Sequence, residues 1–236
     1  MAEVQNEVPW RISDVVKAIA ALFLIFFPGF LISLLPFGGG RLSSAEPFIS
    51  GVIMALTEGV LILLAWYFGT RKYRAHFSEL GFNSFKVLNS LVKGAIWLSV
   101  IKVITIIYGL LAILVFGLKP PEELVQGIPD IFGRGISGVI LAVFVVAVVA
   151  PVAAETFFRG FVYPAFRKRY GVWAGIFISS TIFALFHTRL WLIVPVIVMG
   201  AVLAYLYEEE KSLGPPIVLH SLNNLLSVVI IYAQKG

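Results

Sequence analysis

Long apolar runs dominate this chain and decide what it can fold into. Only helices or closed barrels satisfy their backbone polar groups in lipid, and these runs lack the alternating pattern of a barrel strand. A helical span needs about 20 mainly apolar residues. Seven segments approach that length: 14–35, 48–69, 88–117, 135–163, 172–187, 190–207 and 215–233. The sequence therefore predicts an all-α, polytopic transmembrane helical bundle with about seven spans, or eight, forming a single integral-membrane domain over residues 1–236.

The charge content agrees with this fold class. Charged residues make up 13% of the chain, about half of the roughly 25% that is typical of soluble domains. The net charge of +5 is the excess that basic cytoplasmic loops give a membrane protein, so nucleic acid is not an expected partner. The chain has no cysteine, which excludes disulfides, thiol catalysis and thiolate metal sites.

Two basic connections predict the orientation in the membrane. One follows the second apolar run and the other follows the fourth; their basic residues are Arg71, Lys72, Arg74 and Lys86, and Arg167, Lys168 and Arg169. Both should be cytoplasmic. Counting spans from them places the N-terminus in the cytoplasm of a multi-pass protein of the cell membrane. The first run has no small-residue cleavage pattern, so it is predicted to be a retained span and not a signal peptide.

A few strongly polar residues interrupt the later apolar runs. Glu155 and Arg159 are four residues apart, as are His220 and Asn224, so each pair shares one helix face. His187 lies one helical turn after Phe183. Such side chains are costly at membrane depth unless they are paired or line a wet cavity, so we interpret them as candidate functional residues.

The first two of these polar motifs, Glu155 with Arg159 and Phe183 with His187, can reach the same depth in the membrane. Glu155 and His187 lie at similar sequence distances on either side of Tyr170, so in an antiparallel helix pair they sit about 22 and 25 Å from the turn. His220 begins the last run shortly after Pro215 and Pro216. The 208–219 connection must therefore dip inward if the three motifs are to meet.

These motifs resemble those of the CAAX-protease and bacteriocin-processing intramembrane proteases, a family that includes the type II CAAX prenyl endopeptidase Rce. The resemblance covers about residues 136–232, the motif-bearing core. It implies an intramembrane endopeptidase acting on the C-terminal tails of prenylated or otherwise membrane-embedded peptides, with membrane lipid as the other partner. No serine or cysteine is paired with a base in a recognisable motif, so a directly activated water is the simpler attacking group.

One position departs from the family pattern. The family carries two adjacent glutamates before the three spacers and the arginine, whereas this chain reads Ala154-Glu155. By resemblance, the glutamate missing at Ala154 activates the water together with His187, and His220 and Asn224 hold the oxyanion. We assign Arg159 to orienting Glu155. The chain is therefore expected to be inactive or weakened, either as a natural variant or through an engineered substitution at position 154.

Two alternatives remain open from the sequence. Two histidines and a glutamate can hold zinc with an open position, but the H-E-x-x-H spacing is missing, so we expect neither a metal nor another cofactor. The rival function is a non-catalytic membrane binding protein or a proton-coupled transporter in which Glu155, His187 and His220 form a relay.

Overall fold

The computed structural model describes residues 8–33, 47–118, 123–187 and 190–234, and every regular element in these ranges is helical. The α-helices are α1 (Ile12–Ser33), α3 (Pro47–Ala65), α4 (Val87–Phe116), α5 (Glu123–Phe132), α6 (Ile136–Phe144), α7 (Ala150–Glu155), α8 (Tyr163–Tyr170), α9 (Val172–Phe186), α10 (Ile193–Glu210) and α11 (Gly214–Ala233). Each of the seven expected segments is helical over its described residues except at its ends, which confirms the all-α fold class.

Four helical stretches in the described ranges are long and apolar enough to cross a membrane. They are Pro47–Tyr73, Val87–Phe116, Ile136–Tyr170 and Gly214–Ala233, while Val172–Phe186 is apolar but shorter. The chain is thus a multi-pass helical membrane protein. The count of seven spans, the cell membrane as location and the cytoplasmic N-terminus stay predictions.

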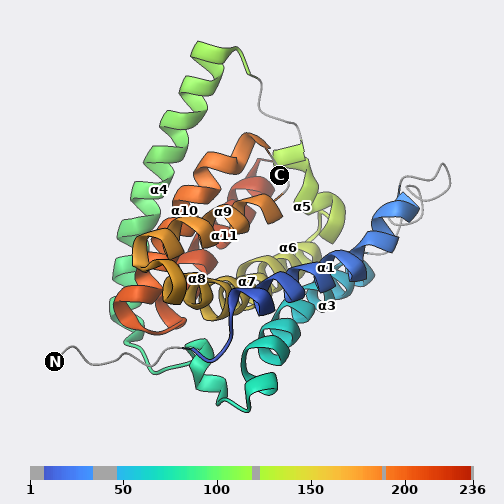
Figure 1. Cartoon of the computed structure of the whole chain (residues 1–236). Helices are drawn as coiled ribbons and strands as arrows, with labels where there is room; N and C mark the ends of the chain where they lie inside the picture. Colours follow the sequence, from blue (N-terminus) through green and yellow to red (C-terminus); the bar gives the residue numbers. More distant parts are fainter. Residues whose placement is uncertain (1–7, 34–46, 119–122, 188–189, 235–236) are drawn as a thin grey trace.

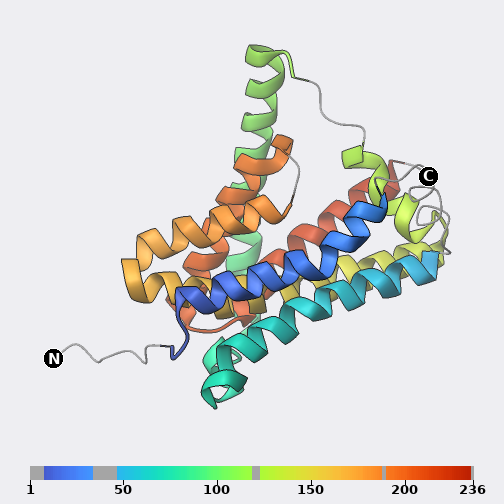
Figure 2. The ribbon, with the colours of Figure 1, turned by 45° about the vertical axis from the view of Figure 1, so that its right-hand side comes forward.

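The helices form two groups around the motif-bearing stretch (Figures 1 and 2). On one side α1 and α3 run beside the stretch from α6 to α8; on the other, α9 and α10 pack together and α11 crosses behind them. Helix α4 packs on α10 and α11 near its start, and its far end rises away from the bundle. The residues of α7 therefore lie between the two groups.

The stretch from Ile136 to Tyr170 is continuous but not uniformly α-helical. Two π-helical segments interrupt it, η4 (Val145–Val149) before α7 and η5 (Thr156–Val162) after it. Single π-turns inside α-helices commonly occur at functional sites. Here they bracket the six residues of α7, which include Ala154 and Glu155.

Glycines let the helices approach closely, as is usual where lipid supplies no hydrophobic drive for helix association. A methyl group at Gly160 would lie 2.5 Å from the carbonyl oxygen of Leu80, and one at Gly200 would lie 3.0 Å from the Ser180 side chain. Gly160 therefore fixes η5 against the loop after α3, and Gly200 brings the backbone of α10 next to α9.

The connection before the last helix is shorter than the sequence indicated. Helix α10 continues to Glu210 and α11 begins at Gly214. The intervening turn is held against the loop before α4, since the Leu213 amide donates to the Gly81 carbonyl at 2.8 Å and the Ser212 hydroxyl donates to the Asn83 carbonyl at 2.9 Å. Residues 212 and 213 are buried, so the chain re-enters the bundle at once and carries His220 inward on the second turn of α11.

Candidate active site

Glu155, the last residue of α7, joins two of the three motifs. Its Oε1 accepts hydrogen bonds from Nδ1 of His220 at 2.7 Å and from Nη1 of Arg159 at 3.2 Å. The side chains of Glu155 and Arg159 are fully inaccessible to solvent, and His220 is 5% exposed. A buried carboxylate needs such partners, because removing it from water costs several kcal/mol. The arrangement fits the predicted orienting role of Arg159.

Arg159 is anchored from a third helix as well. Its Nη2 donates to the Gly200 carbonyl at 3.0 Å, and its Nε lies 3.1 Å from Oε2 of Glu155, outside hydrogen-bond geometry. The guanidinium also lies over the ring of Phe183, 4.4 Å from its centroid. The Arg159 guanidinium, which extends from η5, is therefore held in place by contacts from both α9 and α10.

Phe183 is the common neighbour of both motif histidines. Its ring centroid is 4.6 Å from that of His187 and 5.8 Å from that of His220. The separation of the two imidazoles cannot exceed the sum of these distances, so the second and third motifs share one site. Phe183 itself is 1% exposed.

His187 caps the C-terminal end of α9 and is exposed. Its Nδ1 lies 3.0 Å from the carbonyl oxygen of Phe183. Because a carbonyl oxygen only accepts, this contact is a hydrogen bond when Nδ1 carries the proton, which leaves Nε2 as the acceptor in the neutral imidazole. The geometry thus presents a basic nitrogen away from the helix.

Asn224 binds a backbone carbonyl that has lost its usual α-helical donor in the π-turn. Its Nδ2 donates to the Val146 carbonyl at 2.9 Å. In a regular α-helix the amide of Ala150 would serve that carbonyl, but here it bonds to the Val145 carbonyl instead. The next residue, Pro151, has no N–H to give. Asn224 therefore supplies the missing donor and retains one amide hydrogen for another acceptor.

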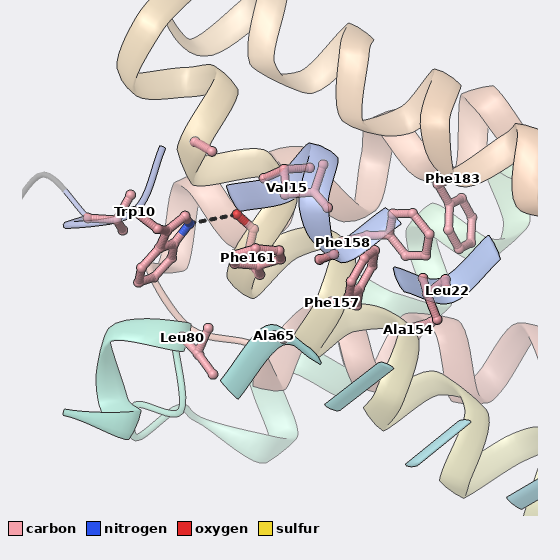
Figure 3. Close-up of a cluster of buried hydrophobic side chains, with 14 residues drawn as sticks. Trp10, Val15, Leu22, Ala65, Leu80, Ala154, Phe157, Phe158, Phe161 and Phe183 are labelled. Carbon is pink, nitrogen blue, oxygen red and sulfur yellow. Dashed lines mark hydrogen bonds between the residues drawn. The ribbon is translucent and has the colours of Figure 1, made fainter. Parts of the chain in front are cut away.

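Position 154 is the one point in the site where the expected polar group is missing. Ala154 is 9% exposed and belongs to the apolar cluster that contains Leu22, Phe158 and Phe183. Figure 3 shows it on the side of this cluster toward Leu22 and Phe157. Phe183 of the same cluster contacts both histidines. The methyl group of Ala154 cannot accept a proton.

In the described part of the chain, no three His, Cys, Asp or Glu side chains lie close enough together to hold a metal ion. Glu155 and His220 touch each other, and His187 does not complete a ligand group with them.

Three features of this site were not predicted from the sequence. They are the π-turns around α7, the Gly200 carbonyl that binds Arg159, and the central place of Phe183. The prolines Pro151 and Pro164 are the local signal for the π-turns: each lies five residues after a carbonyl whose usual α-helical donor has shifted by one residue.

Comparison with known proteins identifies the segment that carries this site. Residues 136–226 match the family described as Type II CAAX prenyl endopeptidase Rce1-like, and this range includes every motif residue discussed above. The motif-bearing segment is therefore similar to the Rce1-like family.

A curated relative supports the same relationship. The chain is 30% identical over 116 residues to a Bacillus subtilis (strain 168) protein named "Putative membrane peptidase YdiL". The aligned region covers 49% of this chain and 46% of that protein, so the chain spans about half the length of the relative that it matches. No solved structure matches this chain.

Proposed function

We propose that this chain has the architecture of an intramembrane endopeptidase that hydrolyses a peptide bond with an activated water, and that Ala154 leaves it inactive or weakened. One observation carries the proposal. Glu155 and His220 meet at 2.7 Å, and Phe183 contacts the rings of both His187 and His220. All of these residues lie in a segment that matches a family of prenyl endopeptidases.

His187 is the residue best placed to take a proton from water. The bond to the Phe183 carbonyl directs its Nδ1 into the helix, so Nε2 is the free acceptor. By the family resemblance, a glutamate at position 154 would share this proton with His187. General-base assistance of this kind contributes about 10² to 10⁴ in rate, and the alanine removes the carboxylate half of it.

His220 and Asn224 are the proposed donors to the oxyanion that forms when water attacks the carbonyl. In its doubly protonated form, His220 donates from Nδ1 to Glu155 and from Nε2 to the oxyanion. Asn224 uses one amide hydrogen on Val146 and has a second available. Each preorganised donor of this type contributes about 3 kcal/mol to transition-state stabilisation.

The proposed substrates are the C-terminal tails of prenylated or membrane-embedded peptides. Support comes from the matched family, whose description names a prenyl endopeptidase, and from the position of the site among apolar helices. We propose that the reaction uses no metal or other cofactor; zinc held by the histidines and Glu155 is the alternative. A chelator that abolishes activity, with recovery on adding zinc, would favour the metal.

The rival proposal is a non-catalytic membrane binding protein or a proton-coupled transporter, and the methyl group at Ala154 is the observation that favours it. The deciding experiment compares the chain as it stands with Ala154→Glu for cleavage of a farnesylated peptide in nanodiscs. We expect the glutamate to raise turnover with little change in peptide affinity, and His187→Ala in that background to abolish the gain. If Ala154→Glu gives no cleavage, the rival function replaces the protease.

A further inference from the structure

We propose that a groove between the start of α1 and the end of α8 binds the headgroup of an anionic phospholipid. The groove has a volume of about 530 Å³. Its lining includes an apolar part, Trp10 and Ala165, and three basic residues, Arg11, Lys168 and Arg169. It lies apart from the candidate active site, and the inference does not depend on the proposed protease function.

The groove lies where the helices meet the edge of the membrane. The candidate span Ile136–Tyr170 ends one residue after Arg169, and α1 begins one residue after Arg11. Figures 1 and 2 both show the start of α1 next to α8. The headgroup layer of a bilayer therefore coincides with the depth of the basic side chains.

Two hydrogen bonds hold the walls of the groove together. The indole Nε1 of Trp10, which is fully buried, donates to the Phe161 carbonyl at 2.8 Å, as drawn in Figure 3. Lys168 donates from Nζ to the Val8 carbonyl at 3.1 Å. The segment before α1 is thus fixed to the stretch that ends in α8, and the groove is preformed.

In the described part of the chain, the charged residues that line the groove are all basic. No acidic residue of the described chain lines it. The nearest in sequence, Asp14, is buried, and its carboxylate is occupied by Lys72, by the Tyr73 hydroxyl at 2.6 Å and by the Arg11 amide at 2.9 Å. The exposed side chains of Arg11 and Arg169 form no ion pair with a described residue.

A neighbouring cavity shows the opposite arrangement. Arg167 and Lys211 line it, and both bind the carboxylate of Glu208, Arg167 through two contacts of 2.8 and 2.9 Å and Lys211 at 2.6 Å. Each of these cations thus has a carboxylate partner inside the protein. Arg11 and Arg169, which have no such carboxylate among the described residues, are the ones available to an external anion.

A lipid fits the groove better than a free anion because an apolar surface continues from it. Ile12 lines the groove, and Val16 and Phe23 follow on the same face of α1. Val16 is 58% exposed and Phe23 is 67% exposed. A phosphate among the basic side chains can therefore extend its acyl chains along α1. Basic pockets beside membrane spans are known to hold acidic lipid headgroups in this way.

The test measures phosphatidylglycerol binding to the purified full-length chain by native mass spectrometry, with phosphatidylcholine as the neutral probe. The variant is Arg11→Gln with Arg169→Gln. The matched control is Arg71→Gln with Lys86→Gln, which removes the same charge from exposed positions of the other basic loop, outside the groove. We expect the groove variant to bind phosphatidylglycerol roughly tenfold more weakly and the control to bind it nearly as well as the parent.

Three outcomes would overturn the proposal. They are unchanged phosphatidylglycerol binding in the groove variant, an equal loss in the control variant, which would indicate a general effect of net charge, and displacement of the lipid by millimolar inorganic phosphate, which would identify a free-anion site. Thermal unfolding of both variants in detergent shows that they are folded, so a loss of binding is attributable to the groove.

Discussion

Asn224 donates to the Val146 carbonyl, and this side chain takes the place of a backbone amide that Pro151 cannot provide. The bond ties the last helix to the π-turn just before α7. The same bond holds Asn224, the proposed oxyanion donor, at the π-turn of the helix that carries Glu155. The site and the irregular backbone are therefore parts of the same structure.

This relationship predicts a non-additive pair of substitutions. Asn224→Ala should lower stability by about 1–3 kcal/mol, because it leaves the partly buried carbonyl of Val146 without a donor. Pro151→Ala restores an N–H five residues after Val146, so in that background the same Asn224→Ala change should cost clearly less. Thermal unfolding of the parent, the two single variants and the double variant in detergent gives the coupling free energy between Pro151 and Asn224. Strictly additive losses would show that Pro151 does not determine the role of Asn224.

The buried ion pair predicts a second coupling. Arg159→Met leaves the Glu155 carboxylate in the protein interior with His220 as its remaining partner, and should destabilise the chain by about 3–5 kcal/mol. Glu155→Gln combined with Arg159→Met removes both charges and should recover part of that loss. Denaturant unfolding in mixed micelles measures both values. A double variant less stable than Arg159→Met would indicate that the pair is not the main reason for burying the arginine.

Phe183 is expected to act on catalysis beyond its contribution to packing. In the Ala154→Glu background, Phe183→Leu removes the ring that contacts Arg159, His187 and His220, and should reduce turnover at least about tenfold through misplaced groups. Phe161→Leu is the matched control. Phe161 is equally buried in the same apolar cluster, but its ring contacts Trp10 and Phe157 instead. Equal activity losses in the two variants would reduce Phe183 to a packing residue.

The sequence predicted the parts of this fold that depend on local pattern. Apolar runs located the helices, and the similar sequence distances from Tyr170 indicated that Glu155 and His187 could meet. The Gly200 carbonyl that binds Arg159 could not be predicted, because it depends on how closely α10 packs against α9. The π-turns depend on where the helix takes up one extra residue, and the sequence does not show that position. Pro151 and Pro164 show only where a backbone N–H donor is missing. The helix α5 was not expected, since the loop that contains it is too polar to read as a span.

Topology can be tested directly because the chain has no cysteine. Single cysteines at Lys86 and Arg169 should be protected from a membrane-impermeant maleimide in intact cells and should react after the membrane is permeabilised. Both positions belong to the basic connections that the positive-inside rule places in the cytoplasm. Labelling of both residues in intact cells would reverse the predicted orientation.

Glu208 predicts how stability depends on pH at the end of α10. Partial burial opposes ionisation of its carboxyl, but hydrogen bonds from Arg167, Lys211 and Tyr163 outweigh this and hold its pKa below the usual 4.5. Because the pKa of Glu208 is lower in the folded than in the unfolded protein, the ionised carboxylate stabilises the fold. This stabilisation is fully present at pH values above the pKa of the unfolded state, about 4.5. It is lost as the pH falls from there through the pKa of the folded state.

Glu208→Gln should therefore lower the free energy of unfolding by about 2 kcal/mol at pH 7, and the difference from the parent should shrink steadily below pH 4.5. The measurement is thermal unfolding of both proteins in detergent from pH 7 to pH 3. Glu209→Gln is the control, because that carboxylate is more exposed and forms its ion pair with Lys93. A difference between parent and Glu208→Gln that stays constant over this range would mean that the cluster stabilises the turn through packing and not through charge.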